Sequence, residues 1–208
     1  MIALENLTKV FRLDGTAKTV ADNITAVFPT GRSVGLLGRN GAGKSTLLQM
    51  IAGTISWPVG FAGSFHPDLT GIQNTRFVAR IYGADTDELV HFVEDFAGLG
   101  VHFRLPVRTY SSGMRSRLAF GISMGIDFDT YLVDEITSVG DNAFRKKSEM
   151  VFAQRLEKVG AVIVSHSLGF VQRVCRHGAV LEDGRIDYYT DIDEAIRHHQ
   201  EVVRYVPS

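Results

Sequence analysis

Residues 38–45, Gly-Arg-Asn-Gly-Ala-Gly-Lys-Ser, match the pattern GxxxxGK[ST] in full, which is typical of a phosphate-binding loop. Its glycines let backbone N–H groups point inward and surround phosphate oxygens at a helix N-terminus. Lys44 can reach the β- and γ-phosphates of a nucleotide, and the Ser45 hydroxyl can coordinate Mg²⁺. A glycine-rich turn is the alternative, and the strand and helix predicted on either side argue against it. The expected nucleotide-binding residues here are Gly38, Arg39, Asn40, Gly41, Ala42, Gly43, Lys44, Ser45 and Thr46.

Two adjacent carboxylates follow a short apolar run farther along the chain. The run 131–133 predicts a buried strand, and Asp134 and Glu135 come directly after it. Asp134 suits the coordination shell of Mg²⁺, through a water molecule, while Glu135 would project toward the γ-phosphate. There Glu135 can orient or deprotonate the attacking water as a general base. Taken alone, the pair fits an exposed acidic turn equally well; after a phosphate loop, the catalytic interpretation is favoured.

His166 follows another apolar run, 161–164. Ligands of parallel α/β sheets gather at the carboxyl ends of the strands. A polar loop histidine is the ordinary alternative, and the phosphate loop and the two carboxylates favour a functional role instead. We therefore expect the catalytic side chains to be Lys44, Glu135 and His166.

Several predicted elements would position these side chains. A strand over 32–37, the glycine loop and a helix over 44–52 form the start of an α/β unit with a parallel sheet. Short strands are also predicted over 2–7 and 24–28. Two more, over 179–182 and 185–188, are predicted to form a hairpin through the turn Asp183-Gly184. Helices are expected over 71–82, 87–97, 112–126, 142–158 and 191–205, the first three forming a mostly helical insert.

The composition narrows the class of protein. The chain has 208 residues, 45% hydrophobic and 22% charged, which excludes a disordered or disulfide-dense chain. Its 22 basic and 23 acidic residues give a net charge of −1, so we expect no nucleic-acid partner. A single cysteine, Cys175, favours a reducing compartment. The longest uncharged run, 45–67, holds polar groups and helix breakers that would be costly in lipid, and no membrane span is expected.

A nine-residue segment beginning at Tyr110, Tyr-Ser-Ser-Gly-Met-Arg-Ser-Arg-Leu, narrows the class further. Ser111 would cap a helix whose free N–H groups can bind an anion, and a well-capped helix without further function is the alternative. In order and spacing, the segment resembles the signature motif of ATP-binding cassette (ABC) proteins, usually LSGGQ. Tyr110, Ser112 and Met114 depart from that consensus, while Ser111 and Gly113 keep it.

The resemblance to ABC proteins covers essentially the whole chain. It implies that Phe11 stacks on the adenine of ATP, with a core phenylalanine as the alternative. Residues 138–141, Ser-Val-Gly-Asp, resemble the D-loop, and His166 takes the place of the switch histidine. The resemblance also implies that two cassettes meet head to tail, so that Ser111 and Gly113 of one act on the γ-phosphate held by the other. The implied fold is a single domain with a RecA-like P-loop NTPase core (about 1–66 and 126–208), an N-terminal antiparallel β region and a short helical subdomain (about 67–125).

His66 points to a subgroup of the family. Residues 65–71, Phe-His-Pro-Asp-Leu-Thr-Gly, occupy the Q-loop region, and His66 stands where most cassettes have glutamine; a loop residue without a role is the alternative. With the signature and the short helical insert, this segment resembles the ATPase subunits of capsular polysaccharide exporters. Relatives that export O-antigen or teichoic acid often carry an extra C-terminal domain, for which the roughly forty residues after His166 leave no room.

The resemblance implies an ATPase that uses ATP and Mg²⁺ and works with other proteins. A polytopic membrane permease must supply the channel, because nothing in this chain is hydrophobic enough to form one. The other implied partners are a second copy of the chain and, through the permease, periplasmic and outer-membrane export components. The implied location is the cytoplasmic face of the bacterial inner membrane. A small-molecule kinase and a non-transport cassette are the competing classes; the signature and Glu135 argue against the first, and the chain length argues against the second.

Overall fold

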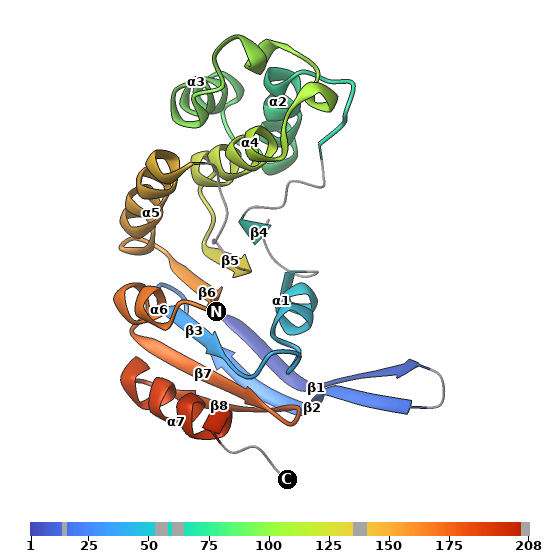
Figure 1. The fold of residues 1–208 in the computed structure, drawn as a ribbon, viewed down its shortest axis with the longest axis vertical. Coiled ribbons are helices and arrows are strands. Elements are labelled where there is room, and N and C mark those ends of the chain that lie inside the picture. The colour runs from blue at the N-terminus through green and yellow to red at the C-terminus, as the bar shows by residue number, and fades with distance from the viewer. Residues whose placement is uncertain (14–15, 53–57, 60–64, 135–140, 205–208) are drawn as a thin grey trace. The chain divides into compact units, whose positions relative to one another are not determined.

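The computed structural model describes residues 1–13, 16–52, 58–59, 65–134 and 141–204 (Figure 1). Contacts divide the chain into two compact units. The first comprises Met1–Ser56, Asp129–Glu135 and Leu156–Ser208, and the second comprises Trp57–Phe128 and Ile136–Arg155. The α/β fold class expected from the sequence is confirmed, while the boundaries expected for the helical subdomain stay a prediction.

The first unit contains an antiparallel hairpin and a mostly parallel sheet. The hairpin pairs β1 (Ile2–Leu13) with β2 (Thr16–Phe28). The sheet strands of this unit lie in the order β5, β6, β3, β7, β8; the β7–β8 pair is antiparallel and the other three pairs are parallel. The remaining elements of this unit are β3 (Ser33–Leu37), α1 (Lys44–Ala52), β5 (Thr130–Asp134), β6 (Gly160–Val164), α6 (Leu168–Val174), β7 (His177–Glu182), β8 (Arg185–Tyr189) and α7 (Ile192–Arg204).

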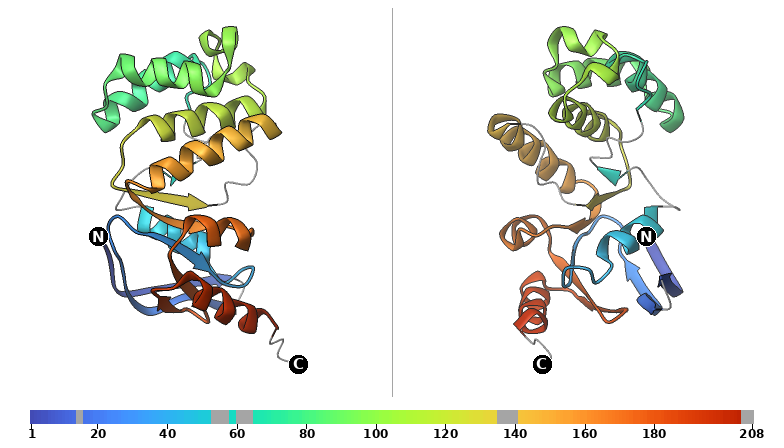
Figure 2. Two further views of the ribbon diagram at one scale, coloured as in Figure 1. Left: turned by 90° about the vertical axis from the view of Figure 1, so that its left-hand side faces the viewer. Right: turned by 45° about the vertical axis from the view of Figure 1, so that its right-hand side comes forward.

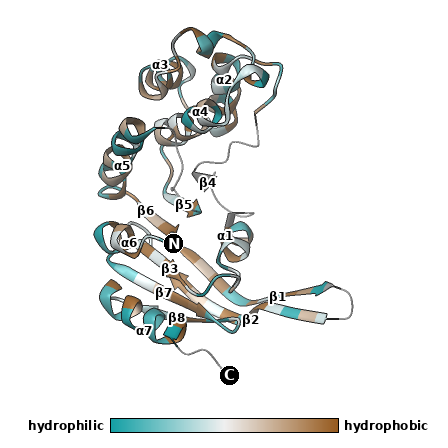
Figure 3. Cartoon of the chain, in the orientation of Figure 1, coloured by the Kyte–Doolittle hydropathy of each residue, from teal (hydrophilic) through white to brown (hydrophobic). Residues whose placement is uncertain are grey.

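The two faces of this sheet are covered by different elements, because side chains alternate along each strand. Val34 and Leu36 of β3 are buried in the core that includes residues of α1 and the hairpin. Gly35 faces the other side, where an added Cβ would lie 2.4 Å from Val171 of α6 and 3.2 Å from Ile192 of α7. Burial on both faces explains why β6 and the middle of β7 are apolar, drawn toward brown in Figure 3.

The second unit is mostly helical (Figure 2). Its elements are β4 (Pro58–Val59), α2 (Gly71–Tyr82), α3 (Thr86–Ala97), two 3₁₀ turns (Gly100–Arg104 and Val107–Thr109), α4 (Ser112–Gly125) and α5 (Asn142–Leu156). Phe96 of α3 contacts Phe120 of α4 and Phe144 of α5, with ring centroids 5.9 and 5.3 Å apart. These aromatic contacts fix α4 between its neighbours. In the part of the chain that the structure describes, no helix is long and apolar enough to cross a membrane.

The β1–β2 hairpin is longer than the sequence predicts. The expected strands, 2–7 and 24–28, are its inner half, where Ile2 and Phe28 pair and are buried. In the outer half, Phe11 pairs with Lys18 and Arg12 pairs with Ala17, and all four side chains are exposed. Without a buried face, this half has no alternating apolar pattern, so the rule that finds half-buried strands does not detect it.

Candidate functional site

The phosphate loop joins β3 to α1 along a path that only glycine permits at two positions. Gly38 and Gly43 have φ angles of 153° and 103°. A Cβ on Gly38 would lie 2.5 Å from the carbonyl oxygen of Leu181, and a Cβ on Gly43 would lie 2.0 Å from a methyl group of Val20. A side chain at either position is therefore excluded both by the backbone conformation and by space.

The ammonium group of Lys44 lies within this loop. Its Nζ donates hydrogen bonds to the carbonyl oxygens of Gly38, at 2.8 Å, and Arg39, at 2.9 Å. Lys44 is also the first residue of α1, whose free N–H groups carry partial positive charge. A fixed cation and a helix N-terminus therefore meet at one point, an arrangement that suits a phosphate group.

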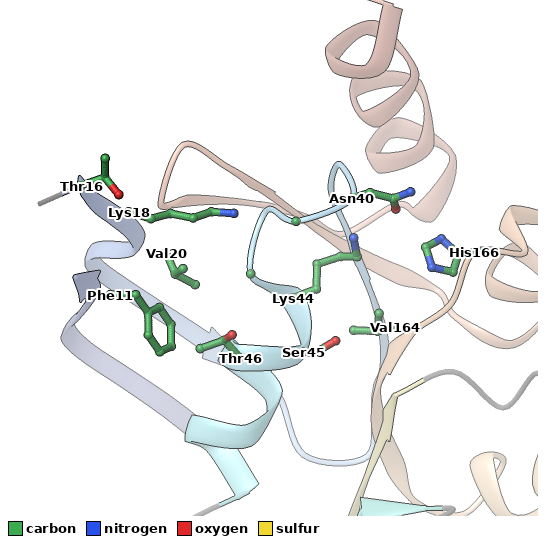
Figure 4. A pocket seen from close by; sticks show the side chains of 12 residues that line it. Phe11, Thr16, Lys18, Val20, Asn40, Lys44, Ser45, Thr46, Val164 and His166 are labelled. Carbon is green, nitrogen blue, oxygen red and sulfur yellow. The ribbon is translucent and has the colours of Figure 1, made fainter. Parts of the chain in front are cut away.

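A cavity of about 650 Å³ opens beside the loop (Figure 4). It brings together the outer hairpin, the phosphate loop and His166, which lie far apart in the sequence. Its volume is in the range of ligand-binding pockets, about 300–1,000 Å³. The lining residues are Phe11, Thr16, Lys18, Val20, Asn40, Gly41, Gly43, Lys44, Ser45, Thr46, Val164 and His166.

The carboxyl ends of β5 and β6 lie side by side, and the end of β6 lines this cavity. Asp134 ends β5 and pairs in register with Val164 of β6, which lines the cavity. The Ser45 hydroxyl and the Asp134 carboxylate supply hard oxygen ligands of the kind that Mg²⁺ prefers, so the residues present fit this ion. Glu135 lies outside the residues that the structure describes, as do residues 138–140 of the expected D-loop.

Phe11 lines the cavity from β1 and is 40% exposed, not a core residue. The ammonium of Lys9 lies 5.1 Å from the centroid of its ring. A cation over an aromatic face is attracted by the ring quadrupole, so Lys9 holds the ring from one side. Phe11 thus presents an accessible ring to the cavity, as stacking on a base requires.

No sequence pattern predicts a role for His199, which lies in α7. It lines a second cavity of about 590 Å³ together with Gly38, Arg39, Lys44 and His166. Its Nδ1 is buried and accepts no hydrogen bond from the described part of the chain. Burial lowers the pKa of the imidazole, and the positive charge of Lys44 lowers it further. A helical pattern alone could not show that this face of α7 lies behind the phosphate loop.

The signature segment begins α4 in the second unit. Ser111 is the N-cap of α4, and its hydroxyl accepts a hydrogen bond from the Met114 N–H at 3.2 Å. Gly113 lies in the first turn, where a Cβ would meet only Ser111 Oγ, at 3.9 Å. Tyr110 departs from the usual leucine without a packing defect: its ring is buried, and its hydroxyl donates to the His102 carbonyl oxygen at 2.7 Å. At the start of α4, Ser111 and Ser112 are exposed and Gly113 is half-buried.

His66 also lies in the second unit, in the turn before α2. Its Nδ1 accepts a hydrogen bond from the Asp68 N–H at 3.3 Å, and its backbone is bonded to Asn74 in both directions, at 2.8 and 3.1 Å. Asn74 is 1% exposed, so this turn is fixed to a buried side chain. The imidazole is exposed, and because Nδ1 is used within the turn, Nε2 is the ring atom that remains to meet a ligand.

Several known proteins are similar to this chain over nearly its full length. The polysialic acid transport ATP-binding protein KpsT of Escherichia coli is 46% identical, with 96% of this chain and 99% of that protein covered. The capsule polysaccharide export ATP-binding protein CtrD of Neisseria meningitidis is 38% identical, with 96% and 98% covered. The O-antigen export system ATP-binding protein RfbB of Myxococcus xanthus is 36% identical over 91% of this chain, but only 47% of that protein is covered.

Solved structures and a family model agree with these relatives. An ATP-binding subunit of an ABC transporter superposes with a TM-score of 0.78 at 20% identity, covering 96% of this chain and 93% of that one. A cassette dimer in a post-hydrolysis state, bound to ADP and phosphate, gives 0.75 at 18% identity, covering 92% and 99%. These two likenesses show the fold, and the model of the ABC transporter family matches residues 21–64. Because KpsT is 46% identical to this chain and is covered over 99% of its length, the chain belongs to the ATP-binding proteins of the ABC transporter family.

Proposed function

We propose that this protein hydrolyses ATP to drive the export of capsular polysaccharide across the bacterial inner membrane through a separate permease. The observation that carries the ATPase part is the cavity that joins Phe11, the phosphate loop and His166. The glycan class rests on the similarity to CtrD, which is named for capsule polysaccharide export, and to KpsT, which is named for polysialic acid transport. Both match this chain along nearly the whole of both sequences.

Within the site, Phe11 would stack on adenine and the loop N–H groups of residues 38–46 would bind the phosphates. Ser45, with Asp134 through a water molecule, would hold Mg²⁺, which when bound would neutralise phosphate charge. Lys44 stabilises the charge that develops on the γ-phosphate oxygens. Glu135 would take the proton of the attacking water, and His166 at the cavity wall would bind the γ-phosphate.

A second copy of the chain would complete the site. Ser111 and Gly113 lie at the start of a helix in the second unit, where Ser111 is exposed and Gly113 is half-buried, and the free N–H groups of this turn can bind an anion. In the head-to-tail dimer, this turn would face the γ-phosphate held by the partner's phosphate loop. The cassette that resembles this chain was solved as a dimer, which supports the arrangement.

The permease would hold the ATPase at the cytoplasmic face of the inner membrane and would contact periplasmic and outer-membrane export components. Export of O-antigen or teichoic acid is the second candidate, because RfbB is also related. This candidate function is the weaker one, because the chain matches less than half of RfbB. A non-transport ATPase is weaker still, because these relatives are named for export or transport.

The test is purification of the tagged chain from detergent-solubilised membranes of its own bacterium, followed by mass spectrometry of its partners and of the bound glycan. We expect a polytopic membrane protein and the capsular polysaccharide. Deletion of the chain should leave that polysaccharide inside the cell, where it can be measured by sugar analysis. Recovery of O-antigen or teichoic acid precursors would establish the second candidate instead, and recovery without any polytopic partner would contradict a transport function.

A further prediction concerns His66. If its imidazole couples the nucleotide to the permease, His66→Ala should reduce export more than it reduces ATPase activity. His66→Gln should restore most of the loss, because the glutamine amide reaches about as far as Nε2 of histidine. His66→Asn, whose amide matches Nδ1 and can still accept from the Asp68 N–H, should restore less. Export and hydrolysis measured in parallel on the same membranes give the comparison.

The control for this prediction is His91→Ala, the same substitution at an exposed position of α3 in the same unit. His91→Ala should change neither the rate of export nor the rate of ATP hydrolysis. Export by His66→Ala at the wild-type level would assign the residue a local role in the turn only. Equal restoration by glutamine and asparagine would place the effect at Nδ1 rather than at Nε2.

A further inference from the structure

We propose that Lys18 binds the α- and β-phosphates of the nucleotide, as a second cation that the outer hairpin brings to the phosphate loop. The inference rests on the proposed function, because it assumes that the cavity holds a nucleoside di- or triphosphate. It assigns a task to the outer half of β1 and β2, which the sequence patterns did not predict as strands.

The register of the hairpin places Lys18 in the cavity. Lys18 of β2 pairs directly with Phe11 of β1. Paired residues of antiparallel strands present their side chains on the same face, with Cβ atoms about 4.5–5.5 Å apart. Both side chains line the cavity, and Figure 4 shows Lys18 extending from the hairpin toward the phosphate loop.

The tip of Lys18 lies at the backbone of the loop. A Cβ built on Gly41 would stand 3.5 Å from Lys18 Nζ. Gly41 has a φ angle of 79°, a conformation that favours glycine, so no side chain separates the ammonium from the loop. The ammonium of Lys44 instead lies inside the loop, bonded to the Gly38 and Arg39 carbonyl oxygens. The two cations therefore reach the same loop from different elements.

The charge of the cavity favours an anion. Among the described residues that line it, the charged side chains of fixed sign are Lys18 and Lys44, and no carboxylate is present. Lys44 serves the β- and γ-phosphates, as the loop pattern implies. Lys18 lies beside Phe11, the proposed contact for the base, and so reaches the phosphates nearer to the sugar. Because ADP and ATP share these phosphates, the contribution of Lys18 should be the same for both.

The test compares Lys18→Gln with the wild type in binding of ADP and of ATP, measured by calorimetry in EDTA so that no hydrolysis occurs. Exposed charge pairs contribute modestly, and a charge-assisted bond to phosphate contributes more. We expect the dissociation constants of both nucleotides to rise by the same factor, roughly three- to tenfold. Lys18→Arg should keep most of the affinity. Added salt should weaken the wild type more than Lys18→Gln, because it screens the attraction.

The matched control is Arg12→Gln, which removes one positive charge from the same exposed half of the hairpin, next to Phe11 but outside the cavity lining. It should leave both affinities within about twofold of the wild type, as expected of a screened surface charge. If Lys18→Gln binds as Arg12→Gln does, the inference is wrong while the proposed function stands. A loss of affinity for ATP but not for ADP would place Lys18 at the γ-phosphate and would also overturn the assignment. A wild-type protein that binds neither nucleotide would overturn both.

Discussion

Glu135→Gln should bind ATP about as tightly as the wild type does and hydrolyse it roughly 10²–10⁴-fold more slowly. Glutamine has nearly the same shape as glutamate, but its amide cannot accept the proton of the attacking water. The nucleotide would therefore stay bound and uncleaved. Since the γ-phosphate is the group that the signature of the partner would contact, the variant should accumulate as a stable dimer in Mg²⁺ and ATP.

The measurement has two parts, phosphate release for turnover and size-exclusion chromatography with light scattering for the dimer. Glu157→Gln is the matched control, because it makes the same change at an exposed residue outside the cavity lining. It should hydrolyse ATP at the wild-type rate. If Glu135→Gln hydrolyses ATP at that rate too, the general base must be another group. A slow variant that remains monomeric would instead separate the catalytic proposal from the dimer proposal.

The phosphate loop and its helix could be predicted from the sequence because their structure depends on local chemistry. The predicted helix over 44–52 has the same bounds as α1, and the Asp183-Gly184 turn joins β7 to β8 as expected. In both cases, the residues themselves impose the conformation: Gly38 and Gly43 adopt φ angles that favour glycine, as does Gly184 at 77°.

The parts of the site that escaped prediction depend on distant contacts. Lys18 enters the cavity because an exposed hairpin continues past its buried half, and no apolar pattern marks that continuation. His199 lies behind the loop because α7 packs, with α6, on the face of the sheet where Gly35 of β3 leaves room for both helices. No periodic pattern predicts the short helix α6, because its seven residues hold too few turns.

Lys44→Ala should lower both ATP affinity and turnover, the latter by roughly 10²–10³-fold, as for loss of one fixed donor at a developing charge. The Nζ of Lys44 is held by the Gly38 and Arg39 carbonyl oxygens, so its charge is in place before the nucleotide arrives. Loss of this charge weakens the binding of the nucleotide and, to a greater extent, the stabilisation of the transition state. Lys158→Ala, an exposed lysine of the same unit, is the control and should match the wild type. Wild-type turnover in Lys44→Ala would contradict the assignment of the loop.

Ser111→Arg should give the contrasting result: nearly intact nucleotide binding by the monomer, with ATP-driven dimerisation blocked. The large charged side chain would stand at the exposed N-cap of α4, where we expect the partner's γ-phosphate. The change also removes the cap on the Met114 N–H, a loss that destabilises helices by itself. Asp85→Arg, which removes the N-cap of α3 in the same unit, controls for that loss and should still dimerise. If Ser111→Arg loses monomer affinity as Lys44→Ala does, Ser111 serves the nucleotide of its own subunit, and the head-to-tail arrangement is wrong.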